Sequence, residues 1–133
     1  MDKLQVAIDL MSCFEGSFIN HNGEIIVHPR TNQYFVMRNC ETVLDVKCKV
    51  LEWMSRSACK SEPYRTKAAN ENLHRFMLNG INQFLGTNFS YADMYLIYTY
   101  LGNACNHERT IRFVESGYDL DMLRRMQNET DPV

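Results

Sequence analysis

The pattern of hydrophobic positions changes character about a third of the way along the chain. Apolar residues at helical spacing predict a first helix over Leu4–Phe14. The apolar segments that follow are short, and the turn signal Asn22-Gly23 separates two of them, so 17–20 and 24–27 are expected to form a β-hairpin. Aromatic and β-branched residues over 33–38 predict a third antiparallel strand.

The remaining pattern is helical. Thr42-x-x-Asp45 resembles a capping box, and it precedes a helix with an apolar stripe wide enough to predict a central position in the core. That stripe comprises Val43, Val46, Val50, Trp53 and Met54. A polar, basic loop is expected over 57–66, and the clearest helical period of the chain follows over Leu73–Phe84.

Three shorter helices are expected after Gly86. Their predicted first turns follow the capping residues Ser90, Asn106 and Asp119. The fold class that results is α+β, in which a small N-terminal antiparallel sheet (a hairpin plus a third strand) packs with a mainly helical C-terminal part.

Length and composition favour one domain over 1–133. The chain has 133 residues, of which 45% are hydrophobic, so a sizeable core is available. The tail over 127–133 has no apolar period and is expected to be frayed.

Charge, hydropathy and cysteine content indicate which partners and which cellular location to expect. The net charge is −2 and the isoelectric point about 6.1, which disfavours binding to duplex nucleic acid. No apolar run approaches the length of a membrane span, and no secretory signal is recognised, so a cytoplasmic location is expected. The five cysteines include no CxxC pair and are interpreted as free thiols that pack as small hydrophobes.

Catalytic and metal-binding motifs are not found. The four histidines are scattered, and the sequence has neither a nucleophile elbow of the GxSxG type nor a Gly-rich phosphate loop. Cys105 and His107 are close enough to form a dyad, although packing is the favoured role for Cys105. We therefore expect a protein without enzymatic activity, metal or cofactor.

Helix starts near arginines and aromatic residues remain as candidate binding elements. The connectors Gly86–Ser90 and Gly102–Thr110 are rich in side-chain donors, and a helix start with a nearby arginine favours an anion. The simpler alternative is that Thr87, Asn103 and Asn106 cap their own helices.

Four segments carry a resemblance to a known family. They are Lys49–Arg56 (KVLEWMSR), Asn82–Ser90 (NQFLGTNFS), Ile97–Asn103 (IYTYLGN) and Phe113–Asp119 (FVESGYD). Together they resemble the Thoeris anti-defence sponge family of small phage proteins, over about 28–123. The resemblance implies that the protein binds and sequesters a cyclic ADP-ribose isomer without cleaving it. It also implies a homo-dimer or higher homo-oligomer.

The same resemblance suggests roles for particular residues. Arg56 and Arg109 would grip the pyrophosphate, and Phe84 would stack on the adenine. The ribose hydroxyls would be bound by Asn103, Asn106 and Thr110. Cyclic oligonucleotides, which some members also hold, would have a second phosphate site at His28 and Arg30.

Two other functions compete with this interpretation. The protein could be a protein-binding inhibitor of a bacterial defence system, similar to an anti-CRISPR protein, because tyrosine is favoured at interfaces. The tyrosine-rich face in question contains Tyr91, Tyr95, Tyr98 and Tyr100. Its alternative role is to pack on the domain. A helix-turn-helix regulator is disfavoured by the acidic balance and by the lack of basic residues between Arg75 and Arg109.

Overall fold

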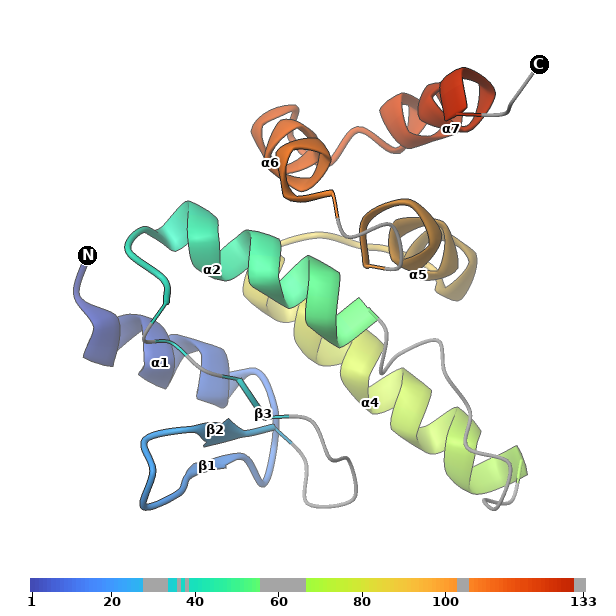
Figure 1. Ribbon diagram of the computed structural model, residues 1–133. Coiled ribbons are helices and arrows are strands. Elements are labelled where there is room, and N and C mark those ends of the chain that lie inside the picture. Colours follow the sequence, from blue (N-terminus) through green and yellow to red (C-terminus); the bar gives the residue numbers. More distant parts are fainter. Residues whose placement is uncertain (28–33, 36, 38, 56–66, 103–105, 131–133) are drawn as a thin grey trace.

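The computed structural model describes residues 1–27, 34–35, 37, 39–55, 67–102 and 106–130 (Figure 1). The N-terminal part contains α1 (Lys3–Ser12), β1 (Phe18–Ile19), β2 (Ile25–Ile26) and β3 (Tyr34–Phe35). The helical part contains α2 (Val43–Lys49), η1 (Val50–Met54), α4 (Lys67–Leu85), α5 (Tyr91–Ile97), η2 (Tyr98–Gly102), α6 (His107–Glu115) and α7 (Leu120–Thr130). The segments η1 and η2 are π-helical continuations of α2 and α5.

The predicted hairpin forms, with strands shorter than expected. Phe18 pairs with Ile26 and Ile19 with Ile25, both antiparallel. In the turn only Gly23 among the described residues takes a positive φ, of 78°, while the Asn20 side-chain oxygen accepts from the backbone N–H of Asn22 and Glu24. The side chain of Asn20 thus shapes this turn together with Gly23.

The third strand adds to the hairpin through two residues. Phe35 pairs with Ile25, and Tyr34 with Ile26, so the strand order is β1-β2-β3. Of the predicted strand over 33–38, positions 33, 36 and 38 lie outside the described residues. Ile25 and Phe35 are buried and anchor the sheet to the core.

The helix of α2 and η1 begins as predicted, and part of its predicted stripe is wrong. Thr42 and Asp45 form the capping box, and Val46 and Val50 are fully buried. Val43 and Trp53, however, are 42% and 46% exposed. A π-helical turn holds more residues than an α-helical turn, so it rotates later residues around the axis. The rotation turns Trp53 outward, and Ser55 is buried further along.

The shorter helices also begin at the predicted caps. Ser90 and Asp93 form a capping box at α5, and the Asn106 side chain accepts from the backbone N–H of Arg109 at α6. The helix α7 reaches Thr130, so 127–130, which were expected to be frayed, are helical, and 131–133 lie outside the described residues.

The elements surround a core of buried apolar side chains contributed by both parts of the chain. In Figure 1, α2 and α4 lie side by side through the middle of the molecule, with α1 and the sheet on one side and α5, α6 and α7 on the other. Fully buried members include Leu10, Val46, Ile81, Met94 and Leu123. The predicted α+β class is confirmed.

Candidate functional site

Two π-helical segments pack against each other, although they are far apart in the sequence. Each is five residues long, and together η1 and η2 form a contact between the ends of α2 and α5. Fewer than about 1% of residues in proteins adopt this conformation, and single π-helical turns often occur at functional sites. We call the contact the π-helix junction, and it is the most unusual feature of the described backbone.

A glycine lets the two π-helical segments approach closely. A Cβ atom at Gly102 would lie 2.8 Å from the Glu52 carbonyl oxygen and 3.1 Å from the Ser55 hydroxyl oxygen. Both distances are shorter than ordinary van der Waals contact, so a larger residue would force the segments apart. The buried Ser55 hydroxyl donates to the Leu51 carbonyl oxygen, which leaves no unpaired hydroxyl on this side of the junction.

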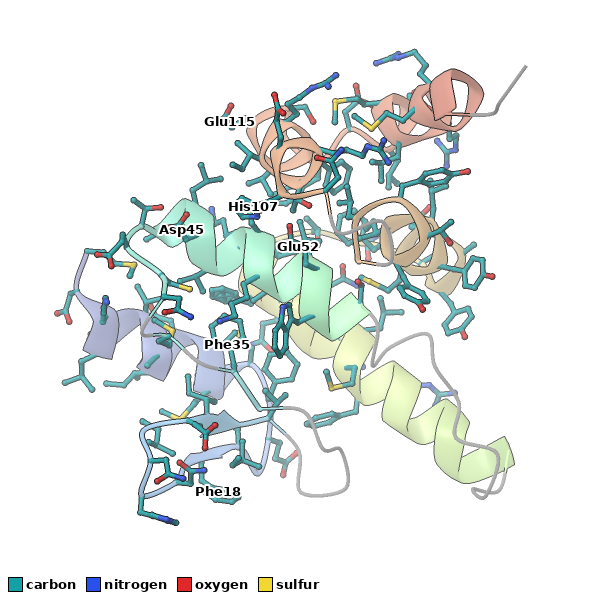
Figure 2. All side chains as sticks on the ribbon, viewed as in Figure 1. Phe18, Phe35, Asp45, Glu52, His107 and Glu115 are labelled. Atoms are coloured by element: carbon teal, nitrogen blue, oxygen red, sulfur yellow. The ribbon has the colours of Figure 1, made fainter. Side chains whose placement is uncertain are left out.

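One side-chain pair connects the junction to the start of α6. His107 Nδ1 lies 3.0 Å from Glu52 Oε1, across 55 positions of sequence. The imidazole is 56% exposed and the carboxylate 19%. Figure 2 shows Glu52 and His107 facing each other between the α2 ribbon and α6. A histidine held through Nδ1 keeps Nε2 available to a ligand, a geometry that also occurs in catalytic and metal sites.

Acidic side chains continue along the same side of α2. Backbone N–H groups of Glu41 and Thr42 donate to the Asp45 carboxylate at 2.9 and 3.0 Å and lower its pKa, with a smaller effect from His107. Burial raises the pKa of the Cys48 thiol to about 12, and the carboxylates of Glu52, Asp45 and Glu115 add to that rise. Cys48 is therefore a neutral packing residue.

Three of the predicted ligand residues lie on the first turns of α6, and the protein itself engages all three. The Asn106 side-chain oxygen caps the helix, as the simpler alternative proposed, but the residue is exposed. One guanidinium nitrogen of Arg109 donates to the Tyr100 carbonyl oxygen at 3.2 Å. Thr110 is fully buried and its hydroxyl donates to the Asn106 carbonyl oxygen, so this hydroxyl is engaged at the start of α6.

Phe84 occupies a different element from these residues. It lies near the end of α4, half-buried, where it packs against the hydrophobic core. Contact with the core accounts for this side chain.

The other predicted ligand residues, Arg56, Asn103, His28 and Arg30, lie outside the described residues. In the sequence Arg56 directly follows Ser55, and Asn103 directly follows Gly102. Ser55 and Gly102 belong to the two sides of the π-helix junction. Ser55 and Gly102, the two described residues that precede these positions in the sequence, therefore lie close to each other.

Two contributors to this region, Glu52 and Tyr100, were not predicted from the sequence, and the exposure of Trp53 on η1 was not predicted either. Glu52 pairs with a histidine 55 positions away, and Tyr100 contributes a backbone carbonyl, so neither carries a local signal. Trp53 did carry a local signal, but its α-helical spacing predicted that it would be buried, and it is exposed.

Two side chains of the tyrosine-rich face, Tyr91 and Tyr95, are exposed to solvent. Tyr91 and Tyr95 are 47% and 58% exposed, and the Tyr95 and Tyr98 rings meet edge to face at 6.5 Å. The opposite face of α5 buries Met94 and Ile97. Tyr91 and Tyr95 are therefore exposed, whereas Tyr98 and Tyr100 are half-buried and Tyr100 packs against the core.

No protein-family model, curated protein or solved structure matches this chain. Over the described part of the chain, no three or more His, Cys, Asp or Glu side chains are grouped so that they could hold a metal ion. Within the same residues, none of the helices has the length and apolar character needed to cross a membrane.

Proposed function

We propose that the protein binds a small cyclic nucleotide at the π-helix junction and holds it without cleaving it. The ligand would be a cyclic ADP-ribose isomer, and the protein would act as a phage-type anti-defence protein that sequesters this immune signal. The single observation that supports the proposal is the meeting of η1 with η2, which brings together Ser55 and Gly102, the residues that precede Arg56 and Asn103 in the sequence.

The described side chains offer suitable groups for an anionic ligand. Arg109 uses one guanidinium nitrogen on the Tyr100 carbonyl oxygen, and a guanidinium has further N–H donors for a phosphate. The exposed Asn106 offers its amide N–H groups, since its oxygen is the atom that caps the helix. The Glu52 carboxylate is already engaged, because His107 Nδ1 lies 3.0 Å from its Oε1.

The affinity that sequestration needs is within reach of such a site. A nanomolar Kd corresponds to about −12 kcal/mol. Each charge-assisted hydrogen bond contributes roughly 1.5–3 kcal/mol, and stacking of a base contributes ~1–3 kcal/mol. Several such contacts approach the total before ordering costs are subtracted.

Calorimetric titration with a cyclic ADP-ribose isomer tests the proposal. Arg109→Ala is expected to weaken binding by about tenfold or more, because a charge-assisted contact is lost. Arg109→Lys keeps the charge, so its Kd should lie between that of the wild type and that of Arg109→Ala. Arg56→Ala should weaken binding about as much as Arg109→Ala does. Arg112→Ala, an exposed arginine on the same helix, is the matched control and should bind normally.

The outcome separates the proposal from its rivals. No heat of binding to the folded wild-type protein would contradict a nucleotide ligand of this class. Equal affinity in Arg109→Ala, Arg56→Ala and Arg112→Ala would contradict the proposed location. Thermal unfolding of each variant shows whether a loss of binding reflects a loss of the fold.

A second candidate function is inhibition of a bacterial defence protein through the face formed by Tyr91, Tyr95 and Tyr98. The observation in its favour is the exposure of Tyr91 and Tyr95. Tyrosines contribute a large contact area with few rotamers to immobilise. In a defence-inhibition assay, Tyr91→Ala and Tyr95→Ala should abolish inhibition under this function, and Arg109→Ala should leave it intact. The reverse pattern supports nucleotide sequestration.

A further inference from the structure

A cluster of one cation and two aromatic rings lies on the sheet side of α2. The Lys49 ammonium nitrogen is 5.4 Å from the centroid of the Phe35 ring and 5.4 Å from that of Trp53. Both distances are within the range of cation–π attraction. Phe35 is buried in β3, so it fixes the base of the cluster, and Trp53 is at the surface.

The exposure of Trp53 is a consequence of the π-helix, and it leaves a large aromatic surface in water. Val50 and Leu51, on the same segment, are fully buried, while Trp53 is 46% exposed. Burying apolar surface stabilises a fold by roughly 25 cal/mol per Å², so an indole at the surface gives up part of that gain. Tryptophan is enriched where proteins bind ligands or partners through one apolar face.

The chemistry of the pair selects a particular kind of ligand. An indole face stacks on planar rings, whichever base they belong to, and an ammonium group binds phosphate as a point charge. From this juxtaposition we propose that Lys49 and Trp53 form a binding site for a nucleoside monophosphate, with the base on Trp53 and the phosphate at Lys49.

This site shares η1 with the π-helix junction but involves β3 in place of η2, and it does not depend on the function proposed above. The Lys49 ammonium lies over the rings of Trp53 and of Phe35 in β3, whereas the carboxylate of Glu52, one residue before Trp53, pairs with His107 of α6. Figure 2 shows Phe35 and His107 on opposite sides of the α2 ribbon in this view.

Trp53 is the only tryptophan of the chain, so its fluorescence reports on the site directly. Titration of the full-length protein with adenosine monophosphate, excited where tyrosine does not absorb, should quench the emission in a saturable manner. Adenosine and inorganic phosphate, each lacking half of the ligand, should bind more weakly than the monophosphate. Saturation by phosphate alone at the same concentration would overturn the proposal.

Variants then show whether binding depends on this site or only on the positive charge of the helix. Lys49→Gln should weaken binding by about tenfold, the typical effect of losing a charge-assisted contact. Lys47→Gln removes the same charge from the same helix and should bind as the wild type does. Trp53→Leu, followed by calorimetry, should lose binding. Equal weakening by Lys47→Gln and Lys49→Gln, or an unchanged Kd in Trp53→Leu, would overturn the site.

The two nucleotide sites remain distinguishable in these experiments. Arg109→Ala should leave the quenching by adenosine monophosphate unchanged. Quenching that disappears in Arg109→Ala and persists in Lys49→Gln would instead assign the signal to the π-helix junction and overturn the Lys49–Trp53 site.

Discussion

Tyr118 combines an unfavourable backbone conformation with favourable packing of its side chain. It has a φ of 63°, in the left-handed region that disfavours residues with a side chain. Its ring packs edge to face on Phe89 and Phe113, with centroids 6.1 and 5.8 Å away. Burial raises the pKa of its phenol, with a smaller contribution from Cys48. The packing of the ring offsets the energetic cost of the left-handed backbone conformation at Tyr118.

The Tyr118 hydroxyl is buried and has no hydrogen-bond partner among the described residues. Tyr118→Phe keeps the ring and removes this group, so it should raise the free energy of unfolding by about 1 kcal/mol, since an unsatisfied buried polar group costs ~1–3 kcal/mol. Chemical denaturation measures the change. Tyr95→Phe, at an exposed ring, is the control and should be neutral. A clear loss of stability in Tyr118→Phe would show that the hydroxyl has a partner.

At the scale of elements, capping patterns are the part of the sequence that predicts structure most reliably. The boxes at Thr42 and Ser90 and the cap at Asn106 all form, because each is a local arrangement of one side chain and nearby backbone N–H groups. The exposure of Trp53 and the pairing of Glu52 with His107 were not predictable in this way. The first depends on a π-helical turn and the second on tertiary packing.

The capping box of α2 makes part of the stability dependent on pH. Hydrogen bonds from Glu41 and Thr42 lower the pKa of Asp45 below its ordinary value of 3.8. A lowered pKa in the folded state stabilises the protein above the unfolded value, and this contribution disappears as pH falls through the lowered pKa. Asp45→Asn should therefore destabilise the protein at neutral pH, and the difference should shrink below about pH 4.

Urea denaturation of the wild type and of Asp45→Asn at several pH values tests this prediction. Asp121→Asn is a useful control, because Asp121 is exposed in the first turn of α7 and pairs with Arg124 on the surface. A destabilisation by Asp45→Asn that stays constant from neutral to acidic pH would contradict the assigned role of the carboxylate.

At the scale of the whole molecule, the N-terminal part packs on the helical part at Gly80 of α4. A Cβ atom at this position would clash with the Phe14 ring, which follows α1. Both residues are buried. The helical period over Leu73–Phe84 was predicted from the sequence, but the need for a glycine within it was not, because Phe14 is distant in the chain.

Gly80→Ala tests this contact. Alanine is normally favoured over glycine within a helix by about 1 kcal/mol. Here the added methyl group should instead destabilise the protein by roughly 1–3 kcal/mol, the usual effect of overpacking a core. Phe14→Leu in the same chain should recover part of the loss, and Gln83→Ala, exposed on the same helix, is the control. Stabilisation by Gly80→Ala would contradict the packing of Phe14 on α4.

The central claim concerns what the π-helix junction does to its ligand, and recovery of that ligand tests it most directly. The protein is saturated with a cyclic ADP-ribose isomer, separated from free ligand, held for hours and then heat-denatured, and the released small molecules are resolved by chromatography. We expect intact ligand in an amount that matches the bound protein. Release of a cleaved product would show that the Glu52–His107 pair or its neighbours turn the ligand over, and would contradict sequestration.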